Sequence, residues 1–476
     1  MTADSGGPPL HGWRTFVTLW STQSVSVLGS ALAAFAFNIY LAQTVFPLAS
    51  QKPQLALALS VTALAFTLTA MLGAPLAGVW ADRHDRRKTM LGCDLISAAV
   101  SLAIGLLMLY LRPSFWPLIP LVAVTGLIGS FHISAFDTSY ATLVSKAQLP
   151  RANGMMQTLQ SLSGLASPAI AAAIVALPAL AHSSGEATWL DLSWLNLSWL
   201  AELQSGVPLA FLIDAASFLF SAAVLMRLVI PSPSADIQQA QRRNLLADIG
   251  FGWRYILDRR PLLWLLLTFA LANFVTWPLS VFETLMVKYQ LAPDWQARGY
   301  TFATALALIT TLGSVGGVLG GVFMSAWGGL QRRRVLGVLV PLIVMGLGQF
   351  LFGLSQHLYF SGAALLLFGL TSPILNAHSQ AIWQGQVPTA LQGRVFSVRR
   401  LIAQFTGPVS IALASVAAGA LPVGWVVMGL SSVLIVFCAA QLFNPALRRV
   451  EDNTWLEQEA ARRQQGRAAQ VIVGLS

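Results

Sequence analysis

Charged side chains are scarce in this 476-residue chain, since Asp, Glu, Lys and Arg make up 10% of it while 56% is hydrophobic. Soluble domains carry roughly 25% charged residues, so this chain could not cover a water-facing surface. Uncharged stretches of about 20 residues recur, the length that a helix needs to cross a bilayer. Lipid offers the backbone no hydrogen-bond partner, and the short alternating segments of a membrane β-barrel are missing. The sequence therefore predicts an all-α integral membrane protein.

Cysteines and nucleotide-binding loops are also scarce. The two cysteines, Cys93 and Cys438, lie in apolar runs, which argues against a disulfide framework or a metal site. No Gly-x-x-x-x-Gly-Lys-Ser/Thr loop occurs, and no soluble segment is large enough for an ATPase domain. Any transport must therefore use an ion gradient or the substrate's own gradient, and we expect no cofactor. No cleavage pattern follows Arg14, so we expect no cleaved signal peptide.

Apolar runs divide the chain into twelve predicted transmembrane helices. They cover 14–46, 57–81, 89–111, 115–143, 153–180 and 207–230, then 262–287, 299–327, 333–355, 358–386, 395–420 and 422–443. One polar stretch separates the first six from the last six. The predicted domains are an N-terminal six-helix bundle over 1–230, a cytoplasmic linker over 231–260, a C-terminal six-helix bundle over 261–445 and a cytoplasmic tail over 446–476.

The positions of the positive charges predict the orientation of the chain. All but four of the 28 Lys and Arg residues fall on the predicted cytoplasmic side. The exceptions are Lys52, Arg112, Lys288 and Arg298. The pI of about 10.2 therefore reflects the positive-inside rule and requires no nucleic-acid partner. We expect a multi-pass protein of the cell membrane with both termini in the cytoplasm, in contact with membrane lipid.

Two segments outside the predicted helices have a composition of their own. The outer loop 181–206 places Trp189, Trp194 and Trp199 at five-residue intervals, which favours a helix or hairpin on the outer leaflet; a substrate lid is the alternative. The segment 450–476 is rich in helix-forming residues of both charges, as expected for a surface helix or a frayed end.

The most informative motif lies between the second and third predicted helices, where residues 78–89 read GVWADRHDRRKT. Gly78 would let two helices approach closely, and Asp82 could face the positive N-terminus of another helix. The arginines that follow would sit at the cytoplasmic interface, near carboxylates and anionic lipid. The alternative reading is an ordinary positive-inside loop with a capping aspartate.

This stretch resembles the signature loop of the major facilitator superfamily in both sequence and position. Further stretches resemble the efflux branch that includes macrolide and enterobactin exporters: WSTQSVSVLGSALAAFAF, LVSKAQLPRANGMMQTLQ, FLIDAASFLFSAA and QAIWQGQVPTALQGRVFSVRRLIAQ. The resemblance implies a monomer of two six-helix bundles around a central cavity, with alternating access. It also implies a cytoplasmic gate in which Asp82, Arg83 and Arg86 form the latch. Gly78, Arg87, Asp94 and Asp137 complete the candidate gate residues.

The chain departs from the family pattern at two places. In the second half, Gly321 and the triplet Arg332, Arg333, Arg334 remain, but Ser325 stands where an aspartate is expected. The two halves of the gate should therefore be chemically unequal. In the fifth predicted helix, alanines follow Pro168 where antiporters of the superfamily often carry glycines, which weakens the support for antiport.

Ionisable residues inside predicted spans are expensive and are therefore functional candidates. Asp94 and Asp137 either neutralise the gate arginines or take up protons that loosen the latch. The candidates for proton or substrate coupling are Asp214, Glu283, His132 and His378. Glu283 has the alternative of pairing with Lys288, and a buried neutral histidine bonded to a carbonyl is the alternative for the two histidines.

A large and weakly polar cavity is expected from the other residues inside the spans. The candidate lining residues are Phe35, Asn38, Gln157, Phe274, Trp277, Asn376 and Trp383. Such a lining suits amphiphilic molecules better than sugars, which need dense hydrogen bonding.

The sequence thus predicts a secondary active transporter, coupled to protons, that exports amphiphilic small molecules such as drugs, macrolides or lipophilic metabolites. Uptake or facilitated diffusion by the same fold is the alternative. A membrane-embedded enzyme would need His, Asp or Glu clustered at one membrane face, and the only such stretch, 82–88, is basic. We therefore expect no enzyme activity.

Overall fold

The structure is a computed structural model, and it describes residues 11–111, 113–145, 148–182, 203–230, 245–452, 454–458 and 461–462. Most of the predicted outer loop and the first half of the predicted linker lie outside these residues, so the proposed interfacial helix or lid at 181–206 stays a prediction. Part of the predicted linker, 245–258, is helical. Both cysteines are buried free thiols.

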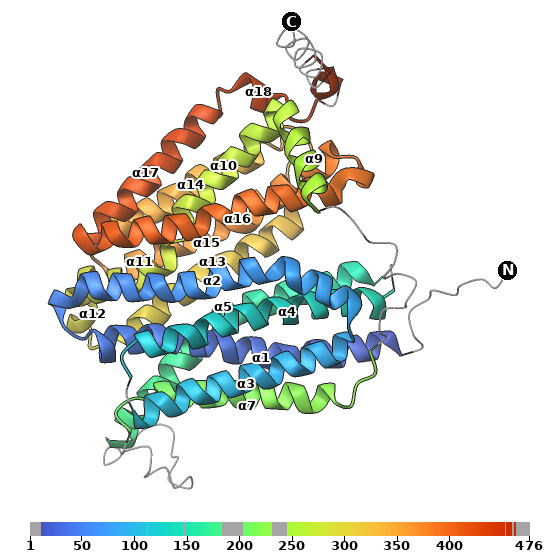
Figure 1. The fold of residues 1–476 in the computed structure, drawn as a ribbon. Coiled ribbons are helices and arrows are strands. Elements are labelled where there is room, and N and C mark those ends of the chain that lie inside the picture. The colour runs from blue at the N-terminus through green and yellow to red at the C-terminus, as the bar shows by residue number, and fades with distance from the viewer. Residues whose placement is uncertain are drawn as a thin grey trace, which may run out of the picture. The chain divides into compact units, whose positions relative to one another are not determined.

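Within the described part of the chain, twelve helical spans are long and apolar enough to cross a membrane, and the elements are all helical (Figure 1). The all-α, twelve-helix fold class is therefore confirmed. The first six spans are built from α1 (Gly12–Tyr40) with η1 (Leu41–Val45), η2 (Ala49–Gln51) with α2 (Lys52–Arg83), α3 (Arg86–Tyr110), η3 (Trp116–Leu118) with α4 (Ile119–Leu143), α5 (Leu149–His182) and α7 (Val207–Leu225). The remainder are α9 (Leu245–Asp258), α10 (Arg260–Thr276), α11 (Leu279–Leu285), η4 (Met286–Gln290), α12 (Ala292–Ala297), α13 (Phe302–Trp327), α14 (Leu336–Leu354), α15 (Leu358–Gln386), α16 (Thr389–Ala420), α17 (Val423–Gln441) and α18 (Pro445–Arg448).

Several helices begin earlier than the apolar runs predict, most of all α2 and α16. The predicted second span begins at residue 57, after Lys52 and Pro53, yet α2 begins at Lys52. Proline is well tolerated at the first turn of a helix, where its missing N–H group would have no partner. The helix α16 begins at Thr389, directly after Pro388, which is its N-cap residue and lies outside the helix.

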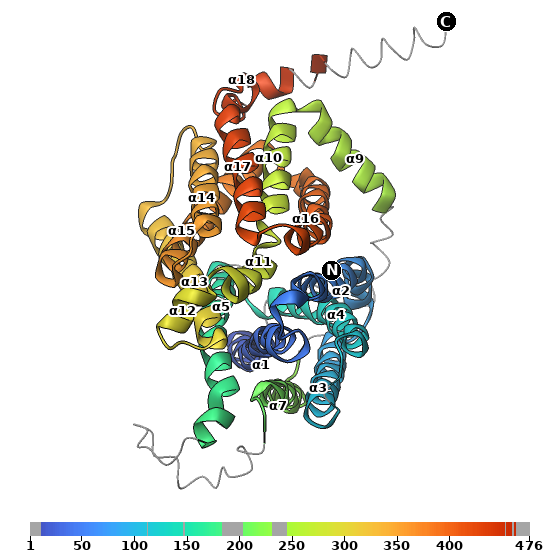
Figure 2. The same cartoon turned by 90° about the vertical axis from the view of Figure 1, so that its left-hand side faces the viewer.

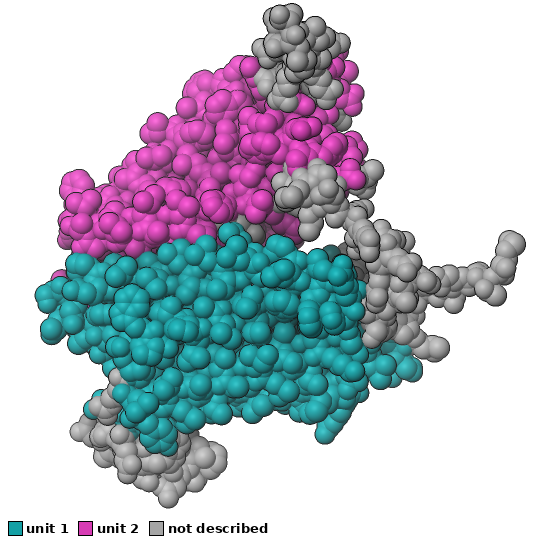
Figure 3. All heavy atoms as spheres, viewed as in Figure 1, with its two compact units in different colours: residues 1–241, 295–311 teal, residues 242–294, 312–476 magenta. Residues whose placement is uncertain are grey.

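The chain forms two compact units (Figure 3). The first comprises residues 1–241 with 295–311, and the second comprises 242–294 with 312–476. Within the first unit, α2 packs along α4, α3 along α4 and α7, and α1 along α5 and α7, as the end-on view in Figure 2 shows. Within the second unit, α14 packs along α15 and α17, while α16 packs along α9 and α10.

Large apolar side chains cover much of the outer surface of the spans. Leu72 and Leu76 on α2 are 69% and 65% exposed, and Val416 on α16 is 72% exposed. A water-soluble protein rarely presents apolar patches of this extent. Apolar side chains on the outside of these helices are therefore consistent with a chain that crosses a membrane.

Proline kinks occur inside several spans, for example at Pro75, Pro168, Pro341 and Pro408. Transmembrane helices tolerate such residues because neighbouring helices and hydroxyl side chains re-satisfy the freed carbonyl groups. The span from Arg260 to Gln290 is interrupted after Thr276, where Pro278 begins the short helix α11.

Close contact between α2 and α4 depends on Gly126. A Cβ at this position would lie 2.3 Å from the Phe66 carbonyl oxygen and 2.4 Å from the Thr69 hydroxyl oxygen. Gly78, by contrast, has no described heavy atom within 4 Å of such a Cβ. Within the described part of the first unit no close approach is found at Gly78; α2 instead meets α4 nearer the start of α2, at Phe66 and at Gly73, where a Cβ would lie 2.6 Å from the Ser130 hydroxyl oxygen.

Gly126→Ala should destabilise the first unit, because the added methyl group forces the two backbones apart at a cost of about 1–3 kcal/mol. Gly129→Ala, one turn later on α4, is the matched control, since a Cβ there meets open space and alanine favours the helix. The thermal midpoint of the purified protein should fall for Gly126→Ala and stay or rise for Gly129→Ala. Equal midpoints for the two variants would contradict the packing.

Candidate functional site

A buried carboxylate lies inside the first unit, at the junction of α1, α3 and α7. Asp94 on α3 is 0% exposed. Its Oδ2 atom accepts hydrogen bonds from the Ser221 hydroxyl at 2.8 Å and from the Gln23 amide at 3.3 Å. The Gln23 amide also donates to the Ser221 hydroxyl oxygen at 2.7 Å, so three helices meet in one polar cluster.

The other oxygen of this carboxylate faces a histidine. Asp94 Oδ1 lies 3.2 Å from His132 Nε2 on α4, but neither atom makes an aligned hydrogen bond with any described group. The His132 side chain is 19% exposed, whereas Asp94 is closed off completely. The pair therefore joins a buried acid to an imidazole that reaches the surface of the unit. The sequence placed Asp94 among the gate residues and His132 among the coupling residues, and the structure brings the two together.

A second buried carboxylate lies in the same helix junction. Asp214 on α7 is 4% exposed. Its Oδ1 atom accepts from the Ser30 hydroxyl at 3.0 Å, and its Oδ2 atom accepts from the Ser101 hydroxyl in a short hydrogen bond. Gly29 leaves space beside this group, because a Cβ there would lie 3.0 Å from Asp214 Oδ1. Both oxygens are thus satisfied by neutral donors from two other helices.

The connection between α2 and α3 is held by its own residues. Asp85 caps α3 by accepting from the Lys88 N–H at 3.1 Å. Arg86 donates to the Thr138 carbonyl at 3.0 Å, and Arg87 donates to the last carbonyls of α7, at 3.0 Å for Leu225. Such guanidinium groups satisfy carbonyls that the helix itself leaves unpaired.

Asp82 and Arg83 lie on the outside of this connection. Both are exposed, and the charge of Asp82 acts on the guanidinium of Arg86. Asp137 is also exposed. The predicted roles of these residues in a gate stay predictions.

The equivalent connection of the second unit, between α13 and α14, is held by residues from elsewhere in the chain. His378 on α15 accepts from the Leu330 N–H through Nε2 at 2.8 Å. Its Nδ1 lies 2.7 Å from the Ile374 carbonyl and must therefore carry the ring proton. The ring is 2% exposed and fits against Gly337, where a Cβ would lie 2.3 Å away. Both nitrogens of a neutral imidazole are thus committed to backbone groups, and we do not propose His378 as a proton carrier.

A tail carboxylate holds the other end of this connection. Glu451 accepts from the Arg334 N–H at 3.0 Å, just before α14, which has no side-chain cap of its own. Ser325, at the position where the family pattern has an aspartate, donates to the Gly321 carbonyl. The tail itself is anchored by the buried side chains of Leu447, Val450 and Leu456.

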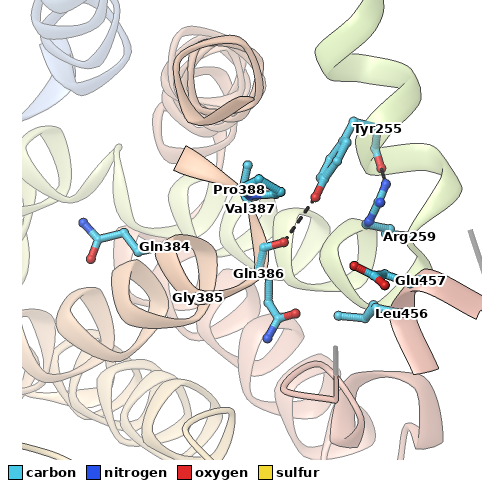
Figure 4. A pocket seen from close by; sticks show the side chains of 9 residues that line it. All are labelled: Tyr255, Arg259, Gln384, Gly385, Gln386, Val387, Pro388, Leu456 and Glu457. Atoms are coloured by element: carbon cyan, nitrogen blue, oxygen red, sulfur yellow. Dashed lines mark hydrogen bonds between the residues drawn. The ribbon is translucent and has the colours of Figure 1, made fainter. Parts of the chain in front are cut away.

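A pocket of ≈ 310 Å³ lies where this tail meets α9 and the end of α15 (Figure 4). The Tyr255 hydroxyl donates to the Gln386 carbonyl at 3.1 Å, and the Arg259 guanidinium stacks over the Tyr255 ring at 3.7 Å. Burial raises the pKa of the Tyr255 phenol, with Arg259 opposing and Glu457 adding to the effect. The phenol therefore stays protonated as a donor at physiological pH. The lining consists of Tyr255, Arg259, Gln384, Gly385, Gln386, Val387, Pro388, Leu456 and Glu457.

The other predicted site residues are dispersed. Phe35 and Trp383 are buried at 9% and 1% exposure, and the Arg399 guanidinium lies 5.0 Å from the Trp383 ring centre. The partly exposed residues are Asn38, Phe274, Trp277 and Glu283, and Asn376 is exposed. The side chain of Gln157 lies outside the described part of the structure. Cavity lining by these residues stays a prediction. In the described residues, no three His, Cys, Asp or Glu side chains gather as metal ligands.

Sequence reasoning missed several residues that hold the two carboxylates. Gln23, Ser30, Ser101 and Ser221 are not among the residues that the sequence analysis singles out. The sequence does contain a pattern that could have identified them. Polar residues recur at seven-residue intervals on three apolar helices, which places them on one face of each helix.

The fold and this cluster define a class: a polytopic α-helical membrane protein whose polar groups are gathered in its interior. The sequence pattern of the Major Facilitator Superfamily matches residues 19–411, so the chain belongs to this superfamily. It is a transporter and not an enzyme.

Similar proteins include exporters. Macrolide efflux protein A of Streptococcus pyogenes is 24% identical over 91% of this chain and 97% of its own length. The enterobactin exporter EntS of Shigella flexneri is 25% identical over 70% of each chain. A solved bacterial homologue of the human lysosomal transporter Spinster has a TM-score of 0.62 at 16% identity, covering 96% of each chain, which supports the fold.

Glu451→Gln should loosen the α13–α14 connection, because the charged acceptor for the Arg334 N–H becomes a weaker neutral one. Trypsin should then cut the full-length protein in nanodiscs faster at Arg332 to Arg334. Asp452→Asn is the matched control: it removes the same charge one residue away and still caps Trp455, whose N–H lies 3.1 Å from the Asp452 carboxylate. Equal cleavage rates in the two variants would contradict this role of Glu451.

Proposed function

We propose that this transporter resides in the cell membrane with cytoplasmic termini and exports amphiphilic small molecules in exchange for protons. The Asp94–His132 pair is the observation that carries proton coupling. A carboxylate with no exposed surface, one oxygen left without an aligned donor, and an imidazole 3.2 Å away form a proton-accepting pair. Histidine is the side chain whose charge changes near physiological pH.

The proton transfer needs no other reactant. Protonated His132 gives its Nε2 proton to Asp94 Oδ1: the N–H bond breaks, an O–H bond forms, and a neutral imidazole and a carboxylic acid remain. Uptake of this proton from water neutralises the carboxylate in the interior of the unit, where an uncompensated charge is costly. Gain and loss of this proton therefore changes the energy of the helix junction, which is what a coupling site must do.

Export and substrate class are supported by the relatives. The printed names of two of them refer to macrolide efflux and enterobactin export. The residues inside the spans are chiefly apolar and aromatic, with few charges, which suits an amphiphile better than a sugar. If the same fold served for uptake, the net movement of the substrate would be into the cell.

The α2–α3 connection is proposed as the cytoplasmic gate. Arg86 and Arg87 fix its position through the carbonyls of Thr138 and Leu225, and this leaves Asp82 exposed and available to a partner. Asp94 lies two turns into the helix that this connection begins, so protonation at Asp94 acts on an element joined directly to the gate.

Cells that carry the protein should accumulate less of at least one member of a panel of macrolides and cationic amphiphiles. An uncoupler should abolish the difference, because it removes the proton gradient. Asp94→Asn should also abolish it, since the amide has the same shape but takes up no proton, while Asp452→Asn should behave as wild type. If export continues in the presence of the uncoupler, or with Asp94→Asn, the coupling assignment is wrong.

The proposed cytoplasmic gate can be tested separately. Asp82→Asn should lower the rate of export several-fold, because the amide cannot supply the charge of the latch. Asp85→Asn changes the same charge in the same connection, but asparagine caps a helix nearly as well as aspartate, so its rate should stay close to wild type. Wild-type export by Asp82→Asn would refute the latch.

A further inference from the structure

Polar residues recur at helical spacing in the interior of the first unit. Each of the three helices α1, α3 and α7 contributes three of them, spaced three or four residues apart, which places them on one helix face. We call these nine residues the polar seam: Gln23, Ser26, Ser30, Asp94, Ser97, Ser101, Asp214, Ser217 and Ser221. The same three helices are neighbours in contact and lie together in Figure 2.

The two carboxylates of the seam lie on opposite sides of the middle of the span. Residue 98 is the middle of α3, and Asp94 lies before it while Ser101, the partner of Asp214, lies after it. Seven helical residues separate Asp94 from Ser101, a rise of about 10 Å. The seam therefore has two carboxylate stations, one nearer the α2–α3 connection and one nearer the opposite end.

The stretch between the stations is lined by hydroxyl groups. Ser26 donates to the Ser217 carbonyl at 3.2 Å, and Ser217 donates to the Asp214 carbonyl at 2.7 Å. Ser97 is 9% exposed and lies one turn after Asp94 on the same helix face. A serine hydroxyl both donates and accepts and turns about its C–O bond, so each of these groups can receive one proton and pass on another.

We propose that the polar seam is a proton-binding element with two stations, Asp94 and Asp214, and that protons pass between them through Ser26, Ser97 and Ser217. The proposal rests on the proton coupling proposed above and adds a second site and a route. It confines the proton route to the three helices α1, α3 and α7.

The proton transfer balances at each step. The carboxylic acid formed at Asp94 gives its O–H proton to a serine oxygen, and that serine releases its own hydroxyl proton to the next acceptor. The last serine protonates a carboxylate oxygen of Asp214. Each serine ends unchanged, Asp94 returns to a carboxylate, and Asp214 becomes a carboxylic acid.

The charges around the seam are consistent with this role. No arginine or lysine side chain is bonded to either carboxylate among the described residues, so a proton is the available neutralising charge. The titratable groups within α1, α3, α4, α5 and α7, apart from the two carboxylates and the cations, are Tyr40, Cys93, Tyr110, His132, Asp137, Tyr140 and His182, the last residue of α5. The cations of these helices lie at their first residues: Arg14, Arg86, Arg87, Lys88 and Arg151. Only His132 among these groups lies within 4 Å of a seam carboxylate in the described contacts.

A purely structural seam would not need two acids. Serine and glutamine side chains join helices inside membranes without any net charge. Burying two carboxylates in one apolar bundle is expensive, and such residues are characteristically functional. Asp214 in particular has all of its donors from neutral hydroxyls, an arrangement that holds a carboxyl group in place in either protonation state.

Infrared difference spectroscopy tests the stations without a substrate. The purified full-length protein in nanodiscs is taken from pH 8 to pH 5, and the C=O stretch of newly protonated carboxyl groups is recorded. Two components of this band should belong to the seam: Asp94→Asn should remove one and Asp214→Asn the other. Ser30→Ala should shift only the Asp214 component, because it removes one hydrogen bond to that group. A spectrum of Asp214→Asn identical to wild type would overturn the second station.

Measurements of export test the proton route through the serines. The triple variant Ser26→Ala, Ser97→Ala, Ser217→Ala should keep both infrared components, which also shows that it folds, yet lose export that depends on the proton gradient. Ser21→Ala, an exposed serine on α1, should keep both. Wild-type export by the triple variant would overturn the route and leave the proposed function standing. The wild-type protein could instead show both infrared components while its export is unaffected by the uncoupler. That result would refute the proposed function.

Discussion

The structure depends on one constraint: inside a bilayer, a polar group must find its partner within the protein. The exposed faces of the spans are covered by leucine, valine and phenylalanine side chains, and polar side chains are gathered where helices meet. Asp94 is the clearest consequence, because a side chain with no exposed surface obtains its donors from Gln23 and Ser221 on two other helices. The fixed positions of these helices follow from that requirement as much as from apolar packing.

The two units satisfy the same constraint with different chemistry at their connecting turns. The α2–α3 turn is held by its own aspartate cap and by arginines that donate to helix-end carbonyls. The α13–α14 turn has no side-chain cap at the start of α14, and its N–H groups find acceptors in His378 and in Glu451 of the tail. The loss of an aspartate at Ser325 is therefore accompanied by contacts from distant parts of the chain. This makes the second turn dependent on the docking of the tail.

The sequence was sufficient to predict the helices, but it was insufficient to predict which polar side chains come into contact. Composition and apolar length predict twelve helices, but they misplace some bounds, such as the starts at Lys52 and Thr389, which lie next to a proline, and the end of α7 at Leu225. Asp94 and His132 were both recognised as costly inside a span, but their contact depends on the rotation of α3 and α4, which no local pattern encodes. For His378 the sequence offered a buried neutral histidine bonded to a carbonyl, which agrees with its contact to the Ile374 carbonyl, but not its second contact. Its partner Leu330 is a backbone N–H group, which leaves no signature in residue type.

The central claim is that export of an amphiphile is driven by protons taken up at Asp94. The most direct measurement follows proton movement in liposomes that contain the purified protein and a pH-sensitive dye. A macrolide is loaded on the side that corresponds to the cytoplasm, with no initial pH gradient. Protons should move in the direction opposite to the macrolide, and Asp94→Asn should abolish this movement. Macrolide movement without any proton movement, or unchanged proton movement in Asp94→Asn, would contradict the account.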